Sequence, residues 1–262
     1  MDVELGTVVH AYGIVATDAG ADLPATGIGG AGVALLEAGP VSAVFSILPE
    51  TAYGAASWQA HSDDPAWLTE TATEHQRVLT DLVRDTDVLP LRLPAMYRDE
   101  MHLHDMLTSQ GDLFRVALDA VHDHVEWAVH LYFGREPDAS TEAGRPASGA
   151  EFFRRKAEVA SRRESARAER EQRVRDAYAA MADVSRQSVV NQPQDPALSG
   201  RPEPMLLNSA HLVCRRHERF FFTAVEETAA RLAPAGITME VTGPWPPYNF
   251  VELGAAPVEA RS

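Results

Sequence analysis

Residues Thr7–Ala16 read TVVHAYGIVA, a run rich in β-branched and aromatic side chains. The run lies between Gly6 and a segment rich in Gly, Asp and Pro, a pattern typical of a β-strand. Two further apolar runs, residues 32–37 and 41–48, flank an Ala-Gly-Pro tripeptide and predict a hairpin. The chain is therefore expected to open with three strands.

Helical and extended segments alternate after the hairpin. Asp63-Asp64-Pro65 predicts a helix start, because Asp caps a helix well and Pro fits its first turn. Residues 99–124 predict a second helical region, which Ser109-Gln110-Gly111 can divide into two helices. The apolar runs 88–93 and 125–133 predict strands. This order predicts an α+β domain with helices on one face of a largely antiparallel sheet.

Two domains are expected. Residues 135–149 have the composition of a linker between a first domain, residues 1–134, and a second domain, residues 150–262. The second domain is expected to contain a long helix and a proline-rich loop over residues 191–204. Its later elements are expected as strand, helix and strand over residues 205–215, 217–233 and 237–241.

The long helix, residues 151–184, is highly charged. Between Glu151 and Asp176 it carries nine basic and six acidic residues, and such mixed signs are typical of a solvated helix surface. Apolar residues recur near heptad spacing, as in a coiled coil. They are Phe152, Val159, Ala166, Val174, Met181 and Val184. The helix is expected to pack along a partner within the chain or on another protein. An acidic partner, or the acidic remainder of this chain, is favoured over RNA.

Composition limits the classes of function. The chain has 262 residues, of which 45% are hydrophobic and 23% are charged, the balance of a soluble globular protein. A net charge of −15 disfavours nucleic acid and anionic membranes as partners. The acidic N-terminus lacks signal-peptide features and no apolar run reaches the roughly 20 residues of a membrane helix, so a cytoplasmic location is expected. Cys214, the single cysteine, is expected to be a buried structural thiol.

The sequence predicts no catalytic, cofactor-binding or metal-binding residues. His102 and His104, like His122 and His124, are two residues apart on predicted helices, so the members of each pair point to different sides. The glycine-rich run at residues 27–32 leads into a strand and lacks a following GKS or GKT. This favours a flexible connector over a nucleotide-binding loop. The G-x-S-x-G motif of serine nucleophiles is absent from the sequence.

Residues 242–251 read TGPWPPYNFV and form the most unusual segment. Three prolines exclude a helix and favour a stiff, extended backbone. Trp245, Tyr248 and Phe250 either fold back to seal the core of the domain or form a docking site for a protein partner. The sealing interpretation is favoured, because large aromatic side chains are usually buried.

The segment GPWPPYNF resembles the C-terminal signature of the GvpF/GvpL family of gas vesicle proteins, and landmarks along nearly the whole chain match in order. The matching residues that are candidates for partner contact are Tyr12, Gly13, Leu89, Pro90, Arg92, Gly243, Pro244, Trp245, Pro246, Pro247 and Tyr248. Residues 93–97 depart from the pattern, since the family has an aromatic residue followed by Gly-Thr at this place.

The resemblance implies a ferredoxin-like first domain and a second α+β domain with a long helix. It implies an accessory protein that binds the hydrophobic shell protein GvpA, and other accessory proteins, during early assembly of the gas vesicle, with or without remaining as a minor shell component. It implies no reaction and no cofactor. We expect an exposed sheet edge of the first domain to bind the shell subunit, whose apolar face would otherwise aggregate. The alternative is a small-molecule enzyme on a ferredoxin-like scaffold.

Overall fold

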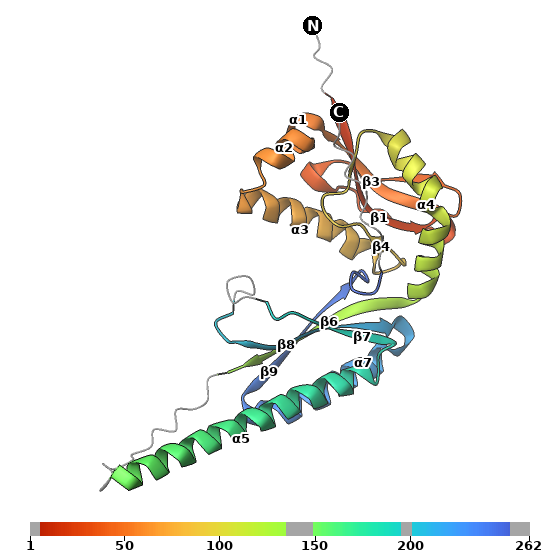
Figure 1. The fold of residues 1–262 in the computed structure, drawn as a ribbon. Helices are drawn as coiled ribbons and strands as arrows, with labels where there is room; N and C mark the ends of the chain where they lie inside the picture. The colour runs from red at the N-terminus through yellow and green to blue at the C-terminus, as the bar shows by residue number, and fades with distance from the viewer. Residues whose placement is uncertain (1–5, 135–148, 195–200, 252–262) are drawn as a thin grey trace. The chain divides into compact units, whose positions relative to one another are not determined.

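The computed structural model describes residues 6–134, 149–194 and 201–251, and the chain divides into two compact units (Figure 1). The first unit comprises Met1–Glu126 and Gly243–Ser262, and the second comprises Trp127–Thr242. The predicted boundaries at residues 134 and 150 differ from this division, because the C-terminal segment belongs to the first unit. The predicted linker, residues 135–149, lies outside the described residues except for Gly149, where a helix begins.

The first unit contains a five-stranded sheet built around β1 (Thr7–Ala16). On one side β1 pairs antiparallel with β3 (Val41–Pro49), and β2 (Ala34–Ala38) pairs antiparallel with the far side of β3. On its other side β1 pairs with two short strands, β4 (Leu89–Pro90) and β5 (Met96–Tyr97). The predicted first strand and the hairpin after it are thus confirmed.

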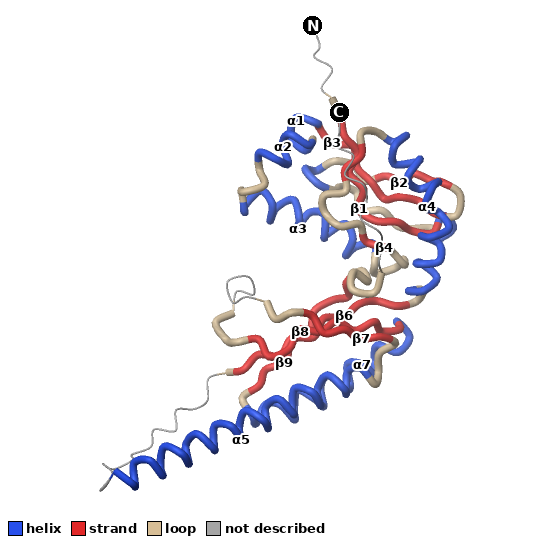
Figure 2. Tube along the Cα trace, in the orientation of Figure 1, coloured by secondary structure: helices blue, strands red, loops and turns tan. Residues whose placement is uncertain are grey.

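Helices cover both faces of this sheet, not one face as predicted (Figure 2). α4 (Glu100–Val121) contributes Leu107 to the apolar core that contains Ala11 of β1. α3 (Pro65–Leu82) places His75 against His10 of β1. Adjacent residues of a strand point to opposite faces, so His10 and Ala11 direct these two helices to opposite sides of the sheet. The prediction was wrong because polar side chains on β1 are buried rather than facing water.

Both long helices of the first unit begin after an Asp residue that caps them, and the cap of the first was expected from the sequence. The Asp64 carboxylate accepts hydrogen bonds from the amides of Ala66 and Trp67, and the Asp99 carboxylate accepts one from the amide of His102. α4 continues through residues 109–111 without the break that the sequence allowed, because its apolar face is packed on the core along the whole length. Two short helices, α1 (Glu50–Tyr53) and α2 (Ala55–Ala60), precede α3.

The second unit has the element order βαββαβ. Its elements are β6 (His124–Phe133), α5 (Gly149–Ala182), β7 (Gln187–Asn191), β8 (Met205–Cys214), α7 (Glu218–Leu232) and β9 (Ile237–Trp245). The strands lie in the order β7-β8-β6-β9, the arrangement of a ferredoxin-like split βαβ unit. The ferredoxin-like topology expected for the first domain is therefore found in the second. The first unit instead begins with three consecutive strands and has the order β2-β3-β1-β4.

One end of α5 holds the core of the second unit together. Ala177 packs with Leu131 of β6, and Met181 packs with Phe221 of α7. Cys214 is half-buried at the end of β8. Four single-turn 3-10 helices complete the described structure of the chain: Thr17–Ala19, Ile28–Gly30, Arg215–His217 and Ala233–Ala235.

Candidate functional site

All eleven candidate residues lie in the first unit, although they come from three distant parts of the sequence. Gly13 is opposite Pro90 in the β1–β4 ladder, and Leu89 is opposite Ile14. Arg92, two residues beyond β4, has an exposed side chain. The segment from Gly243 to Tyr248 ends the last strand and returns to this unit. Sequence motifs separated by more than 150 positions therefore belong to one structural unit.

Gly13 allows β4 to approach β1 closely. A Cβ atom at this position would lie 2.8 Å from the carbonyl oxygen of Leu89. Because this distance is too short for a Cβ atom, only glycine fits here without a shift of the backbone. The strand register also shifts between Ala11 and Gly13, and such a bulge changes the face on which the following side chains lie. Gly13 is thus required by the packing of the sheet.

Tyr12 is fully buried and connects β1 to the glycine-rich loop. Its hydroxyl accepts a hydrogen bond from the amide of Ile28 at 2.8 Å and donates one to Ser46 Oγ at 3.0 Å. Ser46 Oγ in turn donates to the carbonyl of Gly32 at 2.8 Å. Burial raises the pKa of Tyr12, so the phenol is neutral at physiological pH. This network holds the loop in place by hydrogen bonds, whereas the sequence predicted a flexible connector.

The loop is also tied to α3. The amide of Gly29 donates to Glu74 Oε2 at 2.9 Å, and the guanidinium of Arg77 donates to the carbonyl of Thr26 at 2.8 Å. A backbone amide that already donates to a carboxylate is not available to a phosphate group. The loop therefore lacks the open cluster of amides that binds nucleotide phosphates.

Two buried histidines, His10 and His75, pack against the ring of Tyr12, and no sequence motif indicated their role. His10 Nε2 is 2.9 Å from His75 Nδ1, and His75 Nε2 is 3.0 Å from the carbonyl oxygen of Leu91. Because the Leu91 oxygen only accepts, His75 carries its proton on Nε2 and His10 donates to His75 Nδ1. Burial lowers the pKa of His75 to about 4, and burial followed by the proximity of His75 lowers the pKa of His10. The pair is neutral and structural, and its only sequence signal is the place of His10 within an apolar strand.

The C-terminal segment is anchored by a buried carboxylate. Glu126, only 4% exposed, accepts hydrogen bonds from the backbone amide and the side-chain amide of Asn249, at 2.9 and 2.6 Å. Burial raises the pKa of Glu126, while the two hydrogen bonds from Asn249 oppose that shift. The hydroxyl of Tyr248 donates to Gln76 Oε1 of α3 at 3.1 Å. Side chains from β6 and α3 thus hold both residues that follow the double proline.

The three aromatic side chains of the segment, Trp245, Tyr248 and Phe250, are half-buried, so the sealing interpretation stays a prediction. Pro246 and Pro247 are buried, and Val251 packs on the apolar core that contains Leu107. Gly243 has a φ of 140°, a value that side-chain-bearing residues avoid. The segment is therefore a built part of the first unit, and its use as a docking site stays a prediction.

The described residues contain no group of three or more His, Cys, Asp or Glu side chains arranged to hold a metal ion. One histidine of each pair noted in the sequence contacts a carboxylate: His102 Nδ1 lies 2.6 Å from Asp99 Oδ1, and His122 Nδ1 lies 2.7 Å from Asp87 Oδ2. Within those same parts of the chain, none of the helices is long and apolar enough to cross a bilayer.

β2 is one of the two edge strands of the sheet in the first unit, and no described strand pairs with its outer side. β2 stands at the end of the order β2-β3-β1-β4 (Figure 2). Its sequence is ALLEA, so it carries neither lysine nor proline, which commonly protect an edge strand from further pairing. Leu35 on β2 is 37% exposed and Ile47 on β3 is 48% exposed. This edge offers backbone hydrogen-bonding groups beside apolar side chains.

Comparison with known proteins identifies the family. Residues 8–252 match the family described as gas vesicle synthesis protein GvpL/GvpF. The chain belongs to the GvpL/GvpF family. Gas vesicle protein L of Streptomyces sp. (strain CB03234) is 31% identical over 236 residues, which cover 87% of this chain and 86% of that protein. The resemblance inferred from the GPWPPYNF segment is thereby confirmed.

Two solved structures show the same fold in this family. The crystal structure of GvpF from Anabaena sp. PCC7120 has a TM-score of 0.68 at 15% identity and covers 95% of this chain and 98% of that one. GvpF from Microcystis aeruginosa has a TM-score of 0.65 at 15% identity, covering 94% and 99%. At this level of identity the similarity concerns the fold, an α+β structure with antiparallel strand pairs.

Proposed function

We propose that this protein is an accessory protein of gas vesicle assembly that binds the shell protein GvpA through the edge strand β2. Membership of the GvpL/GvpF family supports the role in gas vesicle synthesis. The choice of binding site rests on the edge of β2. No described strand pairs with this edge, and two of the five residues of β2 are leucines.

A strand of the shell subunit would add to this edge by β-augmentation. Every second backbone amide and carbonyl of an edge strand points away from the sheet, and a partner strand pairs with these groups. A gas-filled shell requires subunits with a strongly apolar face, and such faces aggregate in water before they assemble. Pairing with β2 would place the apolar face beside Leu35 and keep the subunit soluble until it joins the shell. The proposed location is the cytoplasm and the growing gas vesicle, and the proposed partners include other accessory proteins.

The alternative of a small-molecule enzyme has no support from the family. The buried titratable residues that an enzyme would use, such as His10 and His75, are neutral and engaged with each other. The proposal is therefore limited to an assembly role, with the protein either leaving the shell or staying as a minor component.

The proposal can be tested by co-purification of the full chain with GvpA. Leu35→Lys places a charge on the edge strand and is expected to abolish co-purification, because edge lysines block strand pairing. Leu113→Lys is the matched control: it makes the same substitution at a leucine that is 52% exposed and lies on the helix α4, away from any strand edge. Equal loss with both variants, or no loss with Leu35→Lys, would contradict binding at β2.

A further inference from the structure

The acidic character of the chain is confined to one of its two units. The segments that form the first unit contain 22 acidic and 6 basic residues, a net charge of −16, whereas Trp127–Thr242 contains 16 acidic and 17 basic residues, a net charge of +1. The second unit thus differs in charge from the rest of the protein, and nine of its basic residues lie on α5.

The first half of α5 carries an apolar stripe that nothing in the described structure covers. Phe152 and Val159 are 51% and 47% exposed, and Ala166 follows at the same seven-residue spacing. At 3.6 residues per turn these positions lie on the side of the helix that also bears Ala177 and Met181, which are buried in the second unit. The face that packs on the domain at the end of α5 therefore continues, exposed, along its first half. Figure 1 shows this half extending beyond the sheet of the second unit.

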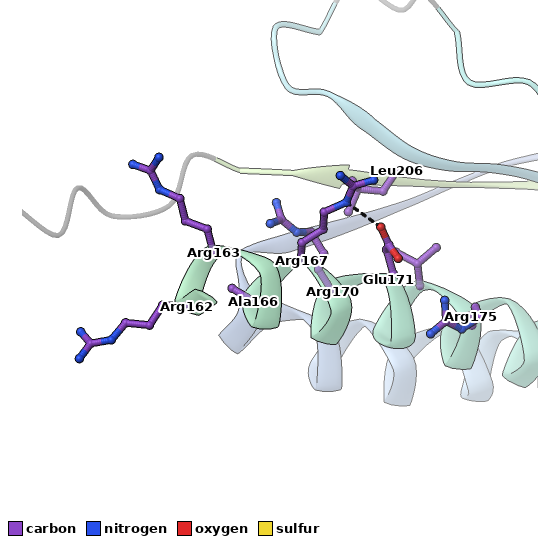
Figure 3. Close-up of a pocket in the computed structure, with 9 residues that line it drawn as sticks. Arg162, Arg163, Ala166, Arg167, Arg170, Glu171, Arg175 and Leu206 are labelled. Atoms are coloured by element: carbon purple, nitrogen blue, oxygen red, sulfur yellow. Dashed lines mark hydrogen bonds and ion pairs between the residues drawn. The ribbon is translucent and has the colours of Figure 1, made fainter. Parts of the chain in front are cut away.

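Arginines surround a hollow beside this stripe. A cavity of about 870 Å³ is lined by Arg162, Arg163, Ala166, Arg167, Arg170 and Leu206, among others (Figure 3). Arg167 bonds to Glu171 at 2.9 Å, and Arg170 lies 3.9 Å above the ring of Phe133. Arg162 and Arg163 form no ion pair with any described residue, and Figure 3 shows both side chains extending into solvent. The hollow thus combines apolar surface with uncompensated positive charge.

We propose that the first half of α5 binds an amphipathic helix of a protein partner whose apolar stripe is flanked by Asp and Glu. An exposed helix of 20 residues, about 30 Å long, offers a surface of the length that helix pairing needs. The partner's apolar side chains contact Phe152, Val159 and Ala166, and its carboxylates meet Arg162 and Arg163. Such pairing places opposite charges at the flanks of the apolar seam, which sets the choice of partner in coiled coils.

Charge argues against a second copy of α5 as the occupant. Residues 149–168 contain six basic and three acidic residues, so two copies of this segment would repel each other along the seam. The proposed surface lies in the second unit and is separate from the β2 edge, so its test does not depend on GvpA binding.

The experiment measures the binding of labelled peptides to the full-length protein by fluorescence anisotropy. One designed peptide of about four heptads has Leu at positions a and d and Glu at e and g, and its counterpart has Lys at e and g. The Glu peptide is expected to bind at least about tenfold more tightly, with affinity falling as salt screens the charges. Equal binding of both peptides would overturn the proposal.

Two variants on the same helix locate the site. Arg163→Glu is expected to weaken binding of the Glu peptide about three- to tenfold, since it converts a surface attraction into a repulsion. Arg154→Glu makes the same charge change nine residues away, about 180° around the helix, and is expected to leave the affinity unchanged. Circular dichroism verifies that both variants keep their helix. An equal effect of the two variants, dimerisation of the protein through α5, or displacement of the Glu peptide by anionic vesicles or by nucleic acid would each contradict the assignment.

Discussion

Replacing Tyr12 by phenylalanine tests whether the first unit is organised around its buried hydroxyl. The change removes one oxygen atom and keeps the ring, which lies 5.5 Å from His75 between ring centroids. The hydroxyl is the acceptor for the amide of Ile28, a residue only 1% exposed. Without it, that amide is buried with no partner in reach, whereas Ser46 keeps its bond to the carbonyl of Gly32.

The expected cost follows from this asymmetry. A buried amide left without an acceptor costs about 1–3 kcal/mol, while loss of a bond whose other partner is satisfied costs little. We therefore expect Tyr12→Phe to lower the free energy of unfolding of the first unit by about 2 kcal/mol, equivalent to a fall in Tm of about 4–8 °C. The glycine-rich loop should also exchange its amide protons faster, most of all at Ile28.

Tyr53→Phe is the matched control. Tyr53 packs its ring 6.0 Å from that of Trp67, between centroids, and lies near Gly29 of the same loop. Its hydroxyl makes no hydrogen bond with any described residue, so its removal should change the free energy of unfolding by less than about 0.5 kcal/mol. Urea unfolding of both variants provides the measurement. A cost below about 0.5 kcal/mol for Tyr12→Phe, or equal costs for the two variants, would refute the reasoning.

Further predictions concern the buried titratable groups and the C-terminal segment. The pKa of His75 is lowered to about 4 in the folded state, so the unfolded chain binds more protons below pH 6.5. The contribution of His75 to the free energy of unfolding is therefore fully present above about pH 6.5 and is lost as the pH falls from there towards about 4. Urea midpoints measured against pH should fall less steeply for His75→Gln than for wild type. Asn249→Ala leaves buried Glu126 with one hydrogen bond fewer, and we expect a loss of about 1.5–3 kcal/mol in thermal unfolding, whereas unchanged stability would argue against the anchor. Gly243→Ala forces a side chain onto a φ of 140° and should cost about 1–3 kcal/mol, a result that an equally stable variant would contradict.

The sequence predicted those features of the first unit that have local signals. The β-branched and aromatic composition of β1 and the Gly-Pro turn after β2 are properties of residues a few positions apart, and both elements were found where expected. The layer arrangement was missed because His10 and Tyr12 resemble side chains of a solvated face. Their burial depends on partners at Ser46 and His75, which no local pattern reveals.

The organisation of the second unit could be read from the sequence only in part. β7 is five residues long, QSVVN, and has only two apolar side chains, so it gave no strand signal. Without β7 the βαββαβ order could not be recognised in the second unit, and the ferredoxin-like topology was expected in the first domain from the family resemblance alone. The return of the C-terminal segment to the first unit depends on the bond between Asn249 and Glu126, residues 123 positions apart.

The candidate residues illustrate the difference between a family signature and a contact surface. Tyr12, Gly13 and the double proline were identified from the sequence, and the structure places them in the interior of the first unit. Their chemistry explains why the fold needs them: a buried hydroxyl, a close approach of two strands and a rigid closing segment. The β2 edge and the arginines of α5 are exposed and have no unusual sequence motif.

Hydrogen–deuterium exchange of the full chain with and without GvpA tests the proposed function most directly. The outward-pointing amides of Ala34–Ala38 are free of strand partners in the described structure and should exchange rapidly in the isolated protein. We predict that GvpA slows exchange at Ala34–Ala38 and leaves residues 149–168 of α5 unchanged. Unchanged exchange at β2, with protection confined to the second unit, would contradict binding of the shell protein at this edge.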